Sequence, residues 1–213
     1  MLEYSEPADT TREGRGRMDE REILYVDDAS EWAAWLDDHH ADTDGVRLAI
    51  LKKGAGGGPY GDYLDVALCF GWIDARRDSL DEHRYLQLFT PRGRTSIWSE
   101  RNREHVARLI ENGAMRAQGL FEVDRAKADG RWEAAYAPQS TASIPDDLAA
   151  ALAANPDAAA FFDTLSSQNR FAILFRTANA KRADTRARRI AQFVDMLARR
   201  ETIYPQRPRD APQ

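Results

Sequence analysis

Apolar residues recur along the chain with two different periods, so the pattern predicts a mixture of helices and strands. In the first periodic segment the i, i+3, i+4, i+7 spacing of a helix face is filled by Trp32, Trp35, Leu36 and His39. Asp28 precedes this stripe as an expected N-cap, and Glu31 follows it three residues later in a variant of the capping box. The ordered part of the chain is therefore expected to begin near Ile23, with a helix soon after.

Alternation of apolar and polar residues predicts three strands in the next stretch. The first begins at Gly45 and turns Val46, Leu48 and Ile50 to one side. After a glycine-rich loop and a short helix at about residues 62–70, residues 72–77 and 83–90 read as two antiparallel neighbours. Together these segments indicate a small antiparallel or mixed sheet near residues 45–90.

Helical periodicity and capping residues dominate the remainder of the chain. Ser99 is an expected N-cap for a helix that Gly113 closes, and a second helix runs to Gly130. Further on, Pro145 and Asn155 begin two short helices. The last helix carries a seam spaced 4, 3, 4, 3 that is expected to face the core, formed by Ala183, Ala187, Ile190, Val194 and Leu197.

These elements predict an α+β fold in which helices pack on the sheet and a helical C-terminal module follows. We expect a disordered extension at residues 1–20, an α+β domain at 21–135, the helical module at 145–200 packed on it, and a loose tail at 204–213. Because residues 136–144 form only a short linker, one compact unit is expected. Met18 could be the natural start of the protein.

Composition narrows the class of protein. The 213 residues carry a formal charge of −5, and this mild acidity argues against a protein that coats nucleic acid. The one cysteine, Cys69, lies in an apolar context where a structural thiol is expected, and it cannot form an intrachain disulfide. Nothing approaches the roughly 18 consecutive apolar residues of a membrane span. A cytoplasmic protein is therefore expected.

Several catalytic and cofactor motifs can be set aside. Gly56, Gly58 and Gly61 formally match the dinucleotide pattern G-x-G-x-x-G, but the first glycine comes several residues after the strand and Pro59 offers no N–H to a phosphate. The four histidines show no recognised metal spacing, and H-E-x-x-H and G-x-S-x-G are absent. No cofactor, metal ligand or recognised catalytic residue is predicted.

The densest group of aromatic, basic and polar residues lies at positions 71–103. Trp72, Asp74 and Arg76 are expected to share one face of the strand at residues 72–77. Arg92 precedes the start of the next helix, where the free N–H groups and the helix dipole favour an anion. The predicted ligand-binding set is Trp72, Asp74, Arg76, Arg92, Ser96, Trp98, Ser99 and Asn102. The alternative is structural, with Asp74 in an ion pair, both tryptophans in the core and Ser99 only a cap.

The last helix is also rich in positive charge. Residues 181–200 hold seven basic and two acidic residues. The basic patch is formed by Lys181, Arg182, Arg186 and Arg189. It favours contact with nucleic acid, an anionic membrane or an acidic partner, whereas the alternative is a solvated helix face that balances an acidic protein.

Several motifs, in order, resemble the bacterial YdeI/OmpD-associated proteins. They are Gly71-Trp72-Ile73-Asp74, Thr90-Pro91-Arg92, Ser96-Ile97-Trp98-Ser99, Gly130-Arg131-Trp132 and the run from Ala180 to Ile190. The resemblance spans about residues 23–199. It implies a role in protection against bacteriocins or cationic peptides, and an N-terminal half similar to the YjbR/CyaY-like α+β fold followed by a helical module. It implies no catalytic residues.

Three functions follow as hypotheses. The first is a non-enzymatic stress or bacteriocin-protection protein that binds a small anionic ligand or a protein partner through residues 71–102. The second is an enzyme that uses Asp74 as acid or base, with Arg92 and Asn102 holding an oxyanion. The third is a nucleic-acid-binding protein that uses the basic helix at residues 181–200.

Overall fold

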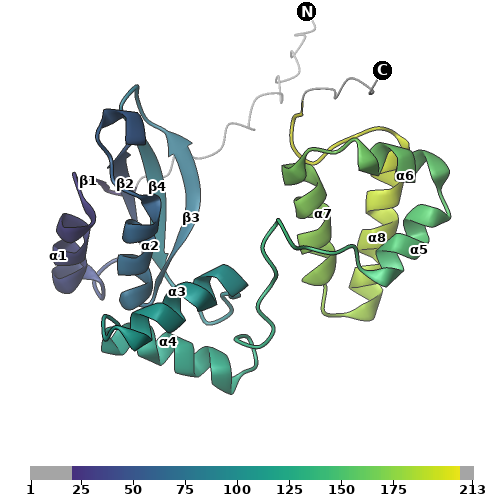
Figure 1. Ribbon diagram of the computed structural model, residues 1–213. Coiled ribbons are helices and arrows are strands. Elements are labelled where there is room, and N and C mark those ends of the chain that lie inside the picture. The colour runs from purple at the N-terminus through teal and green to yellow at the C-terminus, as the bar shows by residue number, and fades with distance from the viewer. Residues whose placement is uncertain (1–20, 207–213) are drawn as a thin grey trace, which may run out of the picture. The chain divides into compact units, whose positions relative to one another are not determined.

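The computed structural model describes residues 21–206 (Figure 1). The extension predicted for residues 1–20 and most of the tail predicted for residues 204–213 lie outside the described residues. Contacts within the chain divide it into two compact units, where the sequence predicted one. The first unit runs to Gly93 and includes Met115–Phe121, and the second comprises Arg94–Ala114 and the chain from Glu122 onward.

The first unit is built on a four-stranded mixed sheet. Its strands are β1 (Ile23–Tyr25), β2 (Val46–Leu51), β3 (Trp72–Ser79) and β4 (Arg84–Pro91), in the spatial order β1-β2-β4-β3. β1 is parallel to β2, while β4 is antiparallel to both β2 and β3. The predicted α+β class with a mixed sheet is confirmed. The three-residue β1 was not predicted, since it is too short to show a period of its own.

Strand register places the predicted apolar positions of β2 in the core. Val46, Leu48 and Ile50 are fully buried and pair with alternate residues of β4, which puts their side chains on one sheet face. Leu86 and Leu88 belong to the opposite face and are buried as well. Both faces of the sheet are therefore shielded from water at its centre.

Two helices cover the sheet face that carries Val46, Leu48 and Ile50. They are α1 (Ala29–His39) and α2 (Tyr60–Cys69), which the short 3-10 helix η1 (Lys53–Ala55) precedes (Figure 1). Asp28 caps α1 as predicted, because its Oδ1 accepts the N–H groups of Ser30 and Glu31. On the buried side of α1, the Trp32 ring lies 5.5 Å from that of Phe89 in β4.

Helices α3 (Glu100–Glu111), α5 (Asp146–Ala153), α6 (Pro156–Asp163), α7 (Ser167–Ala178) and α8 (Ala183–Ala198) belong to the second unit, and α4 (Ala117–Ala128) begins in the first and ends in the second. Predicted caps at Ser99 and Asn155 are confirmed, since each side chain accepts a backbone N–H three residues later. The last four helices share a core in which Leu148, Phe162 and Ile173 are at most 2% exposed.

The seam of α8 differs from its prediction. Ile190 and Leu197 are buried as expected, but Phe193 joins them in the core, whereas Ala183 and Ala187 are exposed. Alanine removes too little apolar surface to set the orientation of a helix against a phenylalanine. The alanines of the seam consequently lie on an open side of α8.

The start of the C-terminal tail is held in place. Asn169 in α7 donates to the Tyr204 carbonyl and accepts the Tyr204 N–H at 2.9 Å. The Gln206 side chain accepts the N–H of Ser166, the N-cap of α7, at 2.9 Å. Residues 204–206 thus differ from the loose tail expected there.

Candidate binding cleft

The eight predicted ligand-binding residues fall into two sets. The first unit holds Trp72, Asp74, Arg76 and Arg92, and the second unit holds Ser96, Trp98, Ser99 and Asn102. Each set can be described within its own unit. The expected convergence of the two sets at one point stays a prediction.

Trp72 belongs to an aromatic cluster in the core of the first unit. It is 1% exposed, and its ring meets those of Trp32 and Trp35 edge-on at 5.9 and 6.3 Å. Its Nε1 donates to the His40 carbonyl at 3.3 Å. The Trp72 indole thus packs in the core and binds the carbonyl at the end of α1. This is the structural role that the sequence offered as the alternative to ligand binding.

A β-bulge changes which arginine accompanies Trp72 and Asp74. Asp74 pairs with Phe89 and Arg77 with Gln87, so two residues of β3 oppose one residue of β4 between these pairs. Arg77 therefore shares the face of Trp72 and Asp74, where the alternation had placed Arg76. The Arg77 guanidinium lies 3.7 Å from the centre of the Tyr85 ring.

Arg76 and the bulge have partners of their own. Arg76 Nε donates to Asp78 at 2.7 Å, in a pair that is exposed to solvent. The buried Gln87 amide donates to the carbonyls of Ala75 and Arg76, two groups that the bulge removes from the regular ladder. The sequence did not predict this role of Gln87, because no local pattern in β3 or β4 indicates a bulge.

Asp74 is engaged by a residue that the sequence did not connect to it. The Tyr60 hydroxyl, from the first turn of α2, donates to Asp74 Oδ2 at 2.9 Å. Burial, followed by the charge and hydrogen bond of Asp74, raises the pKa of the Tyr60 phenol far above its usual range. The phenol therefore stays protonated at neutral pH and remains a donor to the carboxylate.

Arg92 is 5% exposed, and its backbone N–H donates to the Gly71 carbonyl at 3.0 Å. That bond ties Gly71, in the turn between α2 and β3, to the residue that follows β4. Gly71 has φ of 74°, a left-handed conformation that favours glycine. The position of Arg92 is thus set by the backbone geometry at this corner of the sheet.

N–H groups at the start of α3 donate hydrogen bonds to other groups of the protein. Ser99 Oγ accepts the Asn102 N–H at 3.1 Å, and the Tyr136 carbonyl accepts the Glu100 N–H at 3.0 Å. The Tyr136 N–H in turn donates to the Trp98 carbonyl, which completes a bridge between the two segments. With two first-turn donors satisfied by the protein, the predicted anion position loses much of its physical basis.

Two of the sequence motifs meet in the second unit. Trp98 is 2% exposed, and its ring packs edge-on against that of Trp132 at 4.9 Å. Arg131 Nη1 donates to the Ser96 carbonyl at 2.7 Å, while the rest of its guanidinium pairs with Asp129. Residues 96–99 and 130–132 therefore form one small aromatic and basic assembly.

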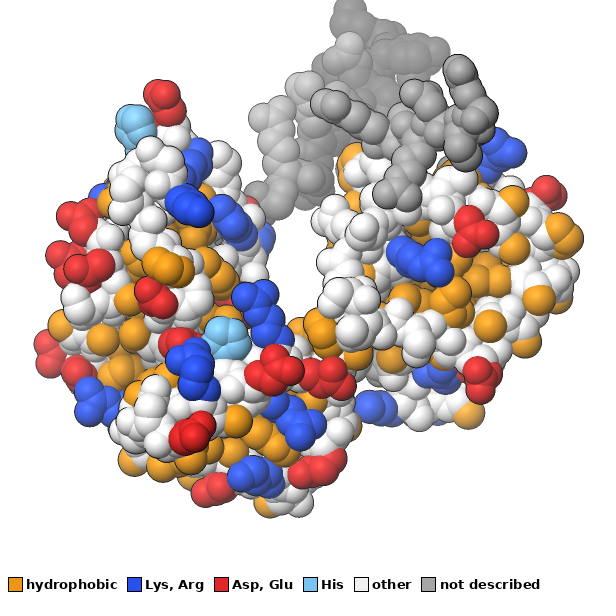
Figure 2. All heavy atoms as spheres, viewed as in Figure 1, with side chains coloured by type: hydrophobic (Ala, Val, Ile, Leu, Met, Phe, Trp, Pro, Cys, Tyr) orange, Lys and Arg blue, Asp and Glu red, His pale blue; other side chains and the backbone are white. Residues whose placement is uncertain are grey.

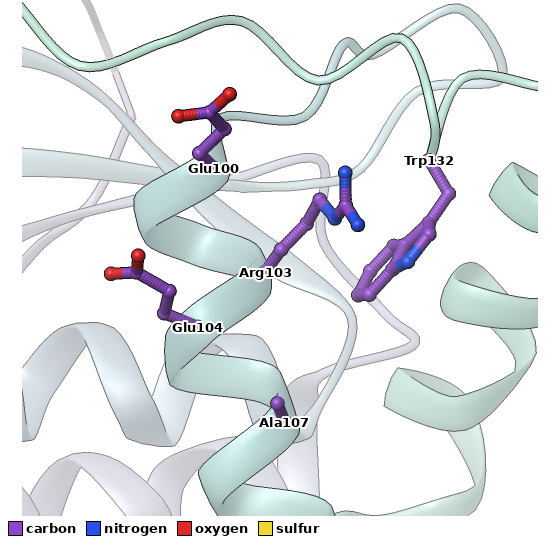
Figure 3. A pocket seen from close by; sticks show the side chains of 5 residues that line it. All are labelled: Glu100, Arg103, Glu104, Ala107 and Trp132. Atoms are coloured by element: carbon purple, nitrogen blue, oxygen red, sulfur yellow. The ribbon is translucent and has the colours of Figure 1, made fainter. Parts of the chain in front are cut away.

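Trp132 of this assembly forms one wall of an open cleft of about 490 Å³ beside α3. We call it the Trp132 cleft, and it is lined by Glu100, Arg103, Glu104, Ala107 and Trp132. Figure 3 shows Arg103 reaching from α3 toward Trp132, with the carboxylates of Glu100 and Glu104 one turn apart on the same helix. The Arg103 guanidinium lies 5.2 Å from the indole centre, and the Lys127 ammonium lies 5.5 Å from it.

Sequence reasoning missed Arg103, Glu104 and Trp132 as binding residues. The available signal was the spacing of positions 100, 103, 104 and 107, which marks one helix face. The sequence could not predict that Trp132 lies beside that face, because its position depends on contacts of its N–H with the Ala126 carbonyl and of its ring with Trp98.

The predicted basic patch consists largely of structural ties. Arg186 binds both carboxylate oxygens of Asp147 in α5, at 2.5 and 2.8 Å, and donates to the Thr177 carbonyl. Hydrogen bonding to Arg186 lowers the pKa of the Asp147 carboxyl from its usual value. Arg189 donates to the Arg176 carbonyl, and Arg182 pairs with Asp184. Lys181 is exposed.

Residues 21–206 contain no group of three His, Cys, Asp or Glu side chains placed to hold a metal ion. Within that same range, no helix has the length and apolar character needed to cross a bilayer. Cys69 is buried at the end of α2.

Fold and site together define a two-unit protein with an α+β sheet unit, a helical module and a cleft walled by aromatic and charged side chains. Residues 141–200 match the family described as "Bacteriocin-protection, YdeI or OmpD-Associated". The chain thus carries a domain of the YdeI/OmpD-associated family, and the resemblance is confirmed there. Residues 24–122 match a domain of unknown function (DUF8412). No curated protein and no solved structure matches the chain.

Proposed function

We propose that the protein is a non-enzymatic bacteriocin or antimicrobial-peptide protection factor that binds a cationic, partly apolar peptide in the Trp132 cleft. The observation that carries the proposal is the chemistry of this cleft, which combines two carboxylates one helical turn apart with a half-buried indole. The family description supports the same class of role. A cytoplasmic location is part of the proposal.

The indole supports recognition of a cation. The Arg103 guanidinium already lies over the Trp132 ring, and the buried Trp98 ring packs edge-on against that ring. A lysine or arginine of a bound peptide would replace Arg103 over the indole, where cation–π attraction contributes about 0.5–1 kcal/mol at an exposed site. Glu100 and Glu104 are both exposed, and their carboxylates point from α3 to the side away from Trp132, where they would meet charges of the peptide beyond the residue on the indole.

Of the two ligand classes expected from sequence, the protein or peptide partner is therefore favoured over the small anion. The N–H groups of Glu100 and Asn102 donate to the Tyr136 carbonyl and to Ser99 Oγ, so few donors at the start of α3 remain for an anion. The enzyme hypothesis stays a prediction, and the described contact of Asp74 is the hydrogen bond that it accepts from the Tyr60 phenol.

Calorimetric titration of the full chain with a synthetic Lys/Leu peptide and a matched Glu/Leu peptide tests the proposal. Each exposed ion pair contributes about 0.2–1 kcal/mol, so Glu100→Gln with Glu104→Gln should weaken Lys/Leu binding by roughly two- to thirtyfold. Arg103→Gln should leave that binding unchanged or strengthen it, because a competing internal cation is removed. Arg101→Gln, an exposed position of α3 outside the cleft lining, is the matched control.

The opposite pattern would replace the proposal with the anionic-ligand version. In that case the Glu/Leu peptide binds and Arg103→Gln abolishes binding. If neither peptide binds at low salt, where surface charges act most strongly, the assignment of the cleft is wrong.

A further inference from the structure

The helical module has a second open feature, an apolar groove of about 600 Å³ between α5 and α8. Its walls are formed by Asp147, Ala151, Ala154, Ala183, Arg186, Ala187, Ile190, Ala191, Val194 and Asp195. Figure 2 shows hydrophobic side chains gathered on the side of this module where α5 and α8 lie. Most of the lining residues are apolar, and the charged ones are the Asp147–Arg186 pair and Asp195.

The open side of α8 is shaped for another helix. Ala183, Ala187 and Ala191 are exposed and spaced four residues apart, so they form one row along the helix. Rows at this spacing are the ridges and grooves through which helices interdigitate, and small side chains allow a close approach. The row adjoins Ile190 and Val194, which add larger apolar surface to bury.

The parts of this chain outside the described residues are poor occupants for the groove. Residues 1–20 have Met1, Leu2, Tyr4 and Met18 as their larger apolar side chains, separated by charged and polar stretches. Residues 207–213 read RPRDAPQ and carry no large apolar side chain. Neither segment has the helical apolar period needed to cover several turns of α8.

Charge at the two ends of the groove is complementary in a way that suits a second copy of the chain. Asp195 lies exposed at one end, one turn before Arg199, whose guanidinium it attracts. The start of α8, beside the other end, follows the exposed cations Lys181 and Arg182, of which Arg182 pairs with Asp184 and leaves Lys181 as the available charge. A two-fold axis that sets two α8 helices antiparallel brings each Asp195 to the basic start of the other helix.

We infer that the groove between α5 and α8 is the contact surface of a homodimer, in which the α8 helices of two copies pack antiparallel through their alanine rows. The Asp147–Arg186 pair holds the wall of the groove in place from within each copy. Because α8 is 16 residues long, the contact belongs to the small class of interfaces that bury less than about 1,200 Å². The dimer is therefore weak and its population depends on concentration.

Sedimentation equilibrium of the full chain between about 5 and 500 μM tests this contact. The unaltered chain should show reversible dimerisation in this range. Ala187→Glu places an unpaired charge in the apolar contact and should weaken dimerisation about tenfold or more. Gln192→Glu, an exposed position of α8 outside the groove lining, should leave it unchanged. Far-ultraviolet circular dichroism confirms that both variants keep their helices.

A charge exchange tests the antiparallel register. Asp195→Lys should weaken dimerisation by roughly two- to thirtyfold, on the scale of two exposed ion pairs. Adding Lys181→Glu to that variant should restore it, because the signs at both ends are then reversed together, while the Arg182–Asp184 pair is left intact. A chain that stays monomeric at the highest concentration overturns the inference, as does a dimer that Ala187→Glu leaves intact. A dimer that Asp195→Lys weakens but the exchange does not restore overturns the register.

Discussion

The two units put similar side chains to different uses. In the first unit, Trp32 and Trp72 are almost fully buried, and Asp74 is held by a phenol. In the second unit, Trp132 is only half-buried beside a cleft, and the alanine row of α8 is exposed. The tryptophans near position 72 thus pack in the core of the first unit. Open surface features lie beside α3 and along α8.

The largest expected effect separates the two kinds of tryptophan. Trp32→Ala should lower the free energy of unfolding by about 3–5 kcal/mol, because a fully buried indole leaves a cavity. Trp132→Ala should cost less, about 1–2 kcal/mol, since part of its surface already meets water. Urea unfolding followed by circular dichroism measures both. Equal losses would mean that Trp132 is a core residue and that the contrast between the units is wrong.

The next effect concerns a glycine inside α4 that belongs to the first unit. Helix propensity alone predicts that Gly119→Ala stabilises the protein by up to about 1 kcal/mol. A Cβ at this position would instead collide with the backbone carbonyls at the end of α2 and lie 2.7 Å from the Leu68 oxygen. We expect a net loss of about 1–3 kcal/mol. Gly113→Ala is not a matched control, since Gly113 has φ of 70°.

A better comparison for Gly119→Ala is Ala117→Gly in the same helix, which changes propensity without a close contact. That variant should cost no more than about 1 kcal/mol. Thermal unfolding of the two variants beside the unaltered chain decides the matter. A rise in melting temperature for Gly119→Ala would contradict the close approach of α2 and α4.

These examples show which parts of the molecule local sequence can predict. The caps at Asp28, Ser99 and Asn155 depend on residues within three positions, and each was predicted correctly. The antiparallel part of the sheet followed from the alternation in β2 and β4. By contrast, the bulge in β3 and the parallel pairing of β1 depend on partners more than ten residues away.

The candidate cleft shows the same limit. The sequence singled out Trp98 and Ser99 as candidate binding residues, but it could not predict which residues surround them. The Trp132 ring packs against that of Trp98, and those residues lie more than thirty positions apart. Similarly, the seam of α8 was misjudged because its period fits two faces, and only the packing of Phe193 selects one.

A smaller effect is expected from the tie between α5 and α8. Arg186→Met should cost about 1–2 kcal/mol, because two charge-assisted hydrogen bonds to a partly exposed carboxylate are lost. The lowered pKa of Asp147 gives this contribution a pH dependence. It is fully present above the unfolded carboxyl value of 3.8 and is lost as the pH falls through the folded value below it.

The stability difference between the unaltered chain and Asp147→Asn should therefore shrink as the pH is lowered from about 6 to about 2. Denaturant unfolding at a series of pH values measures that difference. Asp184→Asn is the control, because its partner Arg182 is 82% exposed and the pair is screened by water. A difference that persists unchanged at low pH would mean that Asp147 acts through packing rather than charge.

The smallest effect is expected where the sequence suggested a nucleic-acid surface. Arg186 and Arg189 donate to groups of their own unit, so few cations of the patch are available to phosphates. Fluorescence anisotropy with a DNA duplex should show only non-specific binding, with a dissociation constant of about 10⁻⁴ M or weaker at physiological salt. Lys181→Gln with Arg182→Gln should change stability by less than about 0.5 kcal/mol. Tight binding with a steep salt dependence that is lost in the double variant would contradict this expectation. It would support nucleic-acid binding by the basic residues at 181–200 over peptide binding by the second unit.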